Sequence, residues 1–113
     1  NVVTLGGDVH CNVAASLRLE PNNPQSPVVA SEFVTTSITS RGLGDKPVAL
    51  IRDSNADLLH FRSDERGYSL ITVTPTDVRC DFRTTPFPAG TETALKTQAS
   101  YVVKNGKAGP QAI

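Results

Sequence analysis

The stretch VVTLGGDVHC, residues 2–11, decides how this sequence is interpreted. Its apolar start predicts a short buried strand, and the two glycines that follow end it, because glycine adopts positive φ angles at little cost. Asp8 and His10 come next, two positions apart. Side chains alternate between two sides of an extended chain, so we expect these two to point the same way. A carboxylate and an imidazole together suit iron, zinc or manganese, and the carboxylate also suits a harder ion.

Two interpretations of the Asp8 and His10 pair remain open. It is either a hydrogen-bonded pair at a strand end, which is common at this spacing, or half of a metal site, which the glycines and the strand end favour. A metal ion needs about four to six donors. The other histidine, His60, lies in a strand-like stretch, where a hydrogen-bonded or solvated role is expected. A complete site therefore needs donors from elsewhere.

The overall composition points to no particular class of partner. The chain of 113 residues forms at most one domain, and its 11 Lys plus Arg balance 11 Asp plus Glu. We therefore expect no field that attracts nucleic acid, an anionic membrane or an acidic substrate. No apolar run approaches the roughly 20 residues of a membrane-spanning helix. The chain begins at Asn1 rather than Met, and we interpret it as a processed or excised piece.

The known short motifs of catalysis and binding are mostly missing. The sequence has no Gly-x-Ser-x-Gly elbow, no phosphate-binding P-loop and no paired Cys-x-x-Cys, which weakens a serine hydrolase, a nucleotide-binding and a zinc-ribbon interpretation. Its two cysteines, Cys11 and Cys80, are expected to be free thiols. On an extended chain Cys11 points away from the side of His10, so we expect it to pack.

The segment SDERGY, residues 63–68, carries charges of both signs before a strand. We expect a solvated loop in which Arg66 pairs with Asp64 or Glu65, since exposed ion pairs are common and weak. The functional alternative is that the Arg66 guanidinium faces an anionic ligand.

Apolar alternation predicts a β-rich chain with one short helix. The helix is expected to be capped by Asp45, with Pro47 in its first turn, and to end near Asn55. Because the strands need a second layer to cover their apolar faces, another sheet or another piece of protein must pack on them. The expected strands are 2–5, 13–20, 28–39, 58–61, 68–74, 78–83 and a last one within 98–109; 68–74 and 78–83 form a hairpin, 21–27 and 84–93 are irregular, and Asn105 and Gly106 form a type I′ turn.

Four segments in this order resemble the C-terminal part of the alkaline phosphatase D (PhoD-like) family of metallophosphatases. The resemblance implies an α+β, β-rich fold that is part of a two-sheet αββα metallophosphoesterase sandwich, with mostly antiparallel strands. It also implies an exported, extracytoplasmic enzyme. The segments are VVTLGGDVH (2–10), SPVVASEFVTTSITS (26–40), RGYSLITVTPTDVRCDFR (66–83) and ASYVVKNGKAGPQ (99–111).

The resemblance also implies roles for the residues of the first segment. In that family the Gly-Asp-x-His element closes a site that holds ferric iron and calcium, so Asp8 corresponds to a ligand on the calcium side and His10 to one on the iron side. The family's remaining ligands, an aspartate, an asparagine, a cysteine and a tyrosine, come from upstream segments with no counterpart here.

Residues 1–113 are accordingly interpreted as one incomplete C-terminal segment of a catalytic domain. We expect the parent to hydrolyse phosphate mono- or diesters, and the isolated chain to be inactive and to need the upstream part or a copy of itself. A rival interpretation is an independent β-rich binding module with a structural Asp8 and His10 pair. A third is a single-metal hydrolase formed by two copies, with His60 or an acidic residue donated across the interface.

Overall fold

Eight strands and one helix follow one another in the computed structural model, which describes all 113 residues. The single helix lies in the middle of the chain, between the third and fourth strands. No helix has the length and apolar character needed to cross a membrane. In chain order the elements are β1 (Val2–Gly6), β2 (Asn12–Arg18), β3 (Val28–Val34), α1 (Asp45–Asp53), β4 (Leu58–Arg62), β5 (Glu65–Val73), β6 (Asp77–Pro86), β7 (Lys96–Lys104) and β8 (Gln111–Ala112).

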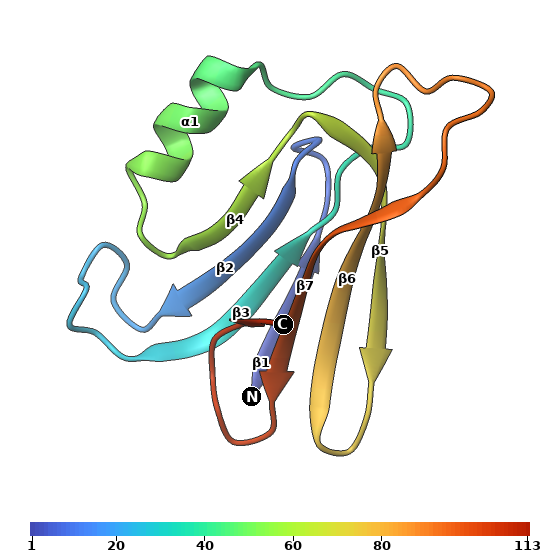
Figure 1. Ribbon diagram of the computed structural model, residues 1–113. Helices are drawn as coiled ribbons and strands as arrows, with labels where there is room; N and C mark the ends of the chain where they lie inside the picture. The colour runs from blue at the N-terminus through green and yellow to red at the C-terminus, as the bar shows by residue number, and fades with distance from the viewer.

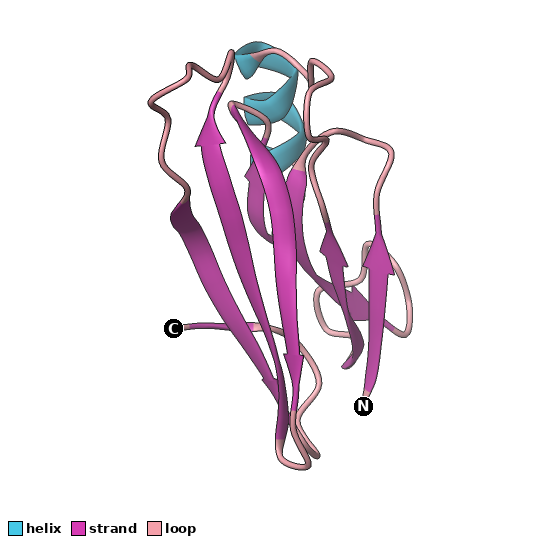
Figure 2. Ribbon diagram, turned by 90° about the vertical axis from the view of Figure 1, so that its right-hand side faces the viewer, coloured by secondary structure: helices cyan, strands magenta, loops and turns pink.

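The strands form two four-stranded sheets that pack face to face (Figure 1, Figure 2). The first sheet has the order β1-β3-β2-β4 and the second the order β5-β6-β7-β8. All neighbouring strands are antiparallel except β1 and β3, which are parallel. The expected β-rich architecture of two packed sheets and one short helix is confirmed.

The main core lies between the two sheets. Phe33 of β3 and Phe82 of β6 are fully buried, and their rings meet edge to face with centroids 6.3 Å apart. Burying one such side chain contributes about 1.5–3 kcal/mol, so this pair contributes strongly to holding the sheets together. The other buried members of this core are Ala14, Cys80, Tyr101 and Val103.

A smaller apolar cluster lies on the outer face of the first sheet. It contains Cys11, which packs as expected, and Val48 of α1 packs against it. The helix covers this face beside β4, while it buries none of its own residues completely (Figure 1). Cys11 and Cys80 are both buried free thiols, which confirms the expectation for the cysteines. The remaining buried members of the cluster are Val13, Ala15 and Phe61.

Several strand boundaries differ from the sequence-based expectation, among them the end of β2, which lies at Arg18 rather than at residue 20. β3 ends at Val34 rather than near residue 39, because the Thr36 amide donates to the Asn12 side chain (3.0 Å) instead of to a strand. β6 continues to Pro86, since β5 already begins at Glu65 and pairs with it there.

Two local details were also predicted wrongly. Asp45 is the first residue of α1, and the N-cap position belongs to Gly44, which has no side chain to cap the helix. In the turn that follows β7, Gly106 has a φ of 75°, but Asn105 has no positive φ. A type I′ turn needs positive φ at both central residues, so this turn is of another type.

Candidate metal centre

The loop that carries Asp8 and His10 joins β1 to β2 and is not an extended chain. Asp8 has a φ of 76° and His10 a φ of 55°, so both lie in the left-handed region, which non-glycine residues rarely adopt. The expectation that they continue an extended strand is therefore wrong. Holding such residues costs of order 1–3 kcal/mol each, and they persist only where the surroundings fix them.

The ring of His10 is held by the loop before α1. Its Nδ1 lies 2.6 Å from the carbonyl oxygen of Arg41. A carbonyl only accepts hydrogen bonds, so Nδ1 must carry the proton and donate it. In the neutral imidazole the other ring nitrogen, Nε2, then has a free lone pair, and this tautomer is the one that can bind a metal through Nε2.

The backbone carbonyl of His10 is fixed separately, by three donors from distant parts of the chain. The Oγ of Ser63, the Oγ1 of Thr36 and the Nη1 of Arg66 donate to it over 3.3, 3.0 and 3.0 Å. These three residues are buried, so water competes little for their hydrogen bonds to the carbonyl. They explain how the left-handed backbone at His10 is maintained.

Asp8 stands in the same loop with its side chain unengaged. It is exposed and makes no hydrogen bond or ion pair within the chain. No group of three or more His, Cys, Asp or Glu side chains lies together anywhere in the structure. Asp8 and His10 are thus the carboxylate and the imidazole that this loop offers, and no third His, Cys, Asp or Glu side chain groups with them.

His60 has a structural environment, as expected. Its Nε2 donates to the Oε1 of Gln98 (2.9 Å), and its ring lies on that of Phe82. Burial lowers the pKa of His60, and the hydrogen bond to Gln98 only partly opposes this effect. The hydrogen bond to Gln98 thus engages Nε2 of His60 inside the fold.

The expected solvated ion pair of Arg66 is absent. Arg66 is only 3% exposed, while Asp64 pairs with Arg62 and Glu65 with Lys96. Its guanidinium instead donates to neutral oxygens and lies 5.2 Å from the ring centroid of Phe87. Sequence reasoning missed this role because nothing in the pattern SDERGY distinguishes a buried arginine from its solvated neighbours.

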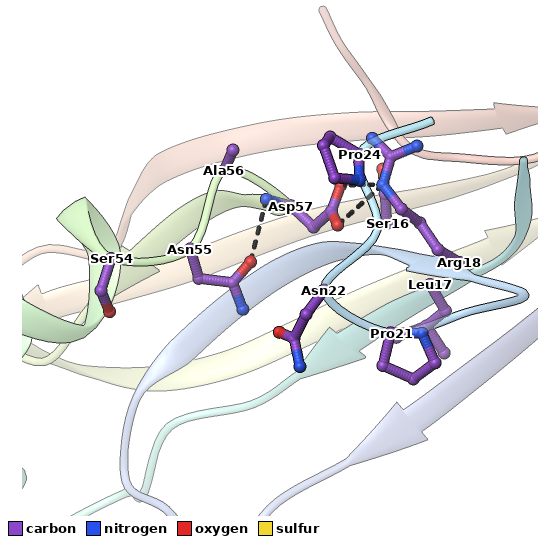
Figure 3. Close-up of a pocket in the computed structure, with 10 residues that line it drawn as sticks. All are labelled: Ser16, Leu17, Arg18, Pro21, Asn22, Pro24, Ser54, Asn55, Ala56 and Asp57. Atoms are coloured by element: carbon purple, nitrogen blue, oxygen red, sulfur yellow. Dashed lines mark hydrogen bonds and ion pairs between the residues drawn. The ribbon is translucent and has the colours of Figure 1, made fainter. Parts of the chain in front are cut away.

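Two hollows border these elements. One of about 340 Å³ lies beside groups that hydrogen-bond to His10, and its lining includes Arg41, Arg66, Asp64, Phe87 and Pro88. A larger one, of about 460 Å³, lies at the far end of β2 (Figure 3). The ion pair of Arg18 with Asp57 (2.9 Å) forms part of its lining, which contains no histidine or cysteine.

Comparison with known proteins identifies the family. The model of the PhoD-like phosphatases matches residues 1–82, which include the loop of Asp8 and His10. The chain belongs to the PhoD-like phosphatase family. This PhoD-like chain is 36% identical over 118 aligned residues to alkaline phosphatase D of Bacillus subtilis (strain 168).

The structural comparison agrees with the family assignment. The solved structure of PhoD matches this PhoD-like chain with a TM-score of 0.83 and 32% sequence identity, over 100% of the chain. The matched region is 22% of that structure and, for the B. subtilis enzyme, 19% of its length. The chain thus spans about a fifth of the length of these relatives.

Proposed function

We propose that this chain supplies His10 and Asp8 to the metal centre of a phosphate ester hydrolase, acting on monoesters or diesters. The observation that carries the proposal is the His10 ring, whose Nδ1–H is held by the Arg41 carbonyl, so that Nε2 keeps its lone pair. A metal-binding histidine almost always donates its other nitrogen to a carbonyl, carboxylate or water in this way. Membership in the PhoD-like phosphatases supports the same chemistry.

The proposed ions are iron, on the side of His10, and calcium, on the side of Asp8. The donor types agree, because imidazole suits iron and a free carboxylate suits a hard cation. When bound, such ions neutralise negative charge on a phosphoryl group and make a water molecule nucleophilic near neutral pH. His10 contributes a fixed lone pair, and Asp8 contributes a carboxylate without a competing cation in the chain.

The hollow beside the His10 loop is the proposed place for part of the phosphate ester. Its lining includes Arg41, Arg66 and Asp64; the Asp64 carboxylate already pairs with Arg62, and Arg66 has no carboxylate partner of its own. An anionic ester is favoured next to such uncompensated positive charge. The aromatic side chain of Phe87 forms an apolar wall of the same hollow.

The missing donors are proposed to come from an upstream part of a longer protein, so that residues 1–113 are one segment of an exported catalytic domain. The outer edge of β1 pairs with no strand in this chain. The side chains of Val2 and Leu5 on that strand are 59% and 63% exposed. An open apolar strand edge recruits a further strand, which supports a covering segment.

The test uses the longer protein that contains this segment. His10→Gln and Asp8→Asn are expected to lower bound metal and the rate of phosphate ester hydrolysis. The matched controls are His60→Gln and Asp53→Asn, because His60 is engaged inside the sandwich and Asp53 is exposed on α1. Metal content and rate that stay unchanged in His10→Gln and Asp8→Asn would reject both assignments.

A second measurement addresses the isolated chain. Residues 1–113 alone are expected to show no hydrolase activity, and to regain it when mixed with the upstream part. A monomeric chain that is fully folded and does not combine with the upstream part would instead favour an independent module.

A further inference from the structure

Arg66 is the most unusual charged residue in the structure. It is 97% removed from solvent, yet none of its hydrogen-bond partners is a carboxylate. An isolated buried charge is costly unless its donors are hydrogen-bonded. Both Nη atoms of Arg66 donate hydrogen bonds, whereas its Nε is buried without a partner. The question is what these donors hold in place.

Most of the donors converge on the site of His10. Nη1 of Arg66 donates to the His10 carbonyl (3.0 Å) and to the Oγ1 of Thr36 (2.5 Å), which itself donates to that carbonyl. Nη2 donates to the carbonyl of Ser63 (2.7 Å), whose hydroxyl also reaches the His10 carbonyl. Arg66 therefore fixes the His10 carbonyl directly, and also indirectly, because it holds Thr36 and Ser63, the two other residues that donate to that carbonyl.

Gly42 completes this arrangement from the other side. A Cβ at this position would lie 2.0 Å from the Oγ of Ser63, 2.6 Å from the His10 carbonyl oxygen and 2.8 Å from Nη2 of Arg66. Only glycine lets the loop approach so closely. The residue before it, Arg41, supplies the carbonyl that accepts from the His10 ring. The same loop therefore contacts the ring of His10 and also the residues that hold the His10 carbonyl.

We propose that Arg66 is a positioning residue for His10, acting with Thr36, Ser63 and the glycine at position 42 as a cradle. The cradle fixes the left-handed backbone of His10, and thereby keeps its ring against the Arg41 carbonyl with Nε2 free. The proposal rests on the proposed function for its importance in catalysis, but the placement of the ring is tested without any metal.

The first test measures the tautomer of His10 in the 113-residue chain, by nitrogen-15 NMR of the neutral imidazole in mildly alkaline solution. The unmodified chain is expected to show Nδ1 protonated. Arg66→Met keeps a long unbranched side chain but removes all donors, and is expected to lose this signature. Arg66→Lys restores a donor and is expected to recover part of it. Arg62→Met is the matched control, because Arg62 pairs only with Asp64 at the surface.

A second pair of variants tests the cradle without removing a charge. Gly42→Ala is expected to lose the Nδ1–H signature, whereas Gly44→Ala, two residues along the same loop, meets nothing within 4 Å and should keep it. Ser63→Ala removes one hydroxyl donor and should weaken the signature. If Arg66→Met does not fold, Gly42→Ala and Ser63→Ala decide the matter.

The third readout is kinetic and uses the longer protein. Arg66→Met is expected to lower kcat or metal affinity by about 10–100-fold, as is typical when a group that orients a metal ligand is lost. The positioning role is overturned if the folded variants keep the His10 tautomer, or if Arg62→Met changes it equally. If His10→Gln leaves activity intact while the NMR results hold, the proposed function fails and the positioning role stands.

Discussion

The imidazole of His60 lies parallel to the phenyl ring of Phe82, with the ring centroids 5.2 Å apart and the planes at 13°. The two residues belong to different sheets, so this stack crosses the interface of the sandwich. Burial holds the pKa of His60 below its ordinary value of 6.5. Neutral imidazole is thus the form that the fold accommodates.

Acid should therefore weaken the fold through His60. Below pH 6.5 the unfolded chain binds a proton at this residue that the folded chain does not, so the stability contributed by neutral His60 is lost as the pH falls toward the folded pKa. The loss is about 1.4 kcal/mol for each unit of pKa difference. The difference in unfolding free energy between the unmodified chain and His60→Gln, measured in urea at several pH values, should shrink below pH 6.5; a constant difference would contradict this.

Glu65 should be required for stability at neutral pH. Its buried carboxylate accepts from Thr84 and Gln98 (both 2.8 Å) and pairs with Lys96. Glu65→Gln leaves one oxygen for these donors and should cost about 1–3 kcal/mol in urea unfolding. Glu32→Gln is the control, because Glu32 is half-buried without a side-chain hydrogen bond and should change stability by less than about 0.5 kcal/mol.

The cost of Glu65→Gln should also depend on pH. Burial by itself raises the pKa of Glu65, but the hydrogen bonds from Lys96, Thr84 and Gln98 outweigh it and hold the pKa below 4.5. The stabilisation is therefore complete above pH 4.5 and is lost as the pH falls through the folded pKa. The unmodified chain and Glu65→Gln should converge in stability in strong acid, and a gap that stays constant would count against this pairing.

Both thiols should be unreactive in the folded chain. Burial raises the pKa of Cys80 to about 12, and Cys11 is fully buried, so neither provides an accessible thiolate. A thiol reagent such as Ellman's reagent should react with neither at pH 8 and with both in urea. Ser54→Cys, on an exposed position after α1, is a positive control that should react at once.

Gly67→Ala should destabilise the second sheet. A Cβ on Gly67 would lie 2.0 Å from the carbonyl oxygen of Arg83 in the neighbouring strand β6, and a paired backbone cannot move aside. We expect a loss of about 1–3 kcal/mol in unfolding free energy. Gly90→Ala, whose Cβ would approach only the Thr93 side chain at 3.4 Å, should cost much less.

The strands were predictable where the apolar pattern is local. The hairpin of β5 and β6 was predicted from two alternating stretches around Pro75, and this pairing forms. The ends of the strands were not predictable, because they depend on distant side chains. β3 ends where Asn12 captures the Thr36 amide, and no pattern within residues 28–39 reveals that partner.

The loop of the candidate site was singled out by its residue types, which stay a prediction, but its geometry was not predictable. The sequence placed the turn at Gly6 and Gly7, whereas the left-handed residues are Asp8 and His10. Three donors that lie 26, 53 and 56 positions away along the chain impose this conformation on His10. Such contacts leave no trace in the local sequence, which is also why the burial of Arg66 was missed.

The parallel pairing of β1 with β3 imposes an order on assembly during synthesis. Val2 of β1 pairs with Ala30 of β3, and β2 lies between these two strands in the chain. β1 is therefore synthesised before the strand with which it pairs. The β2–β3 hairpin closes a much shorter loop than the β1–β3 pairing, so we expect it to form first. We therefore expect residues 2–6 to be translated early and to dock late. The loop bearing His10 is expected to reach its final shape only after Arg66 has been synthesised, because Arg66 donates to the His10 carbonyl.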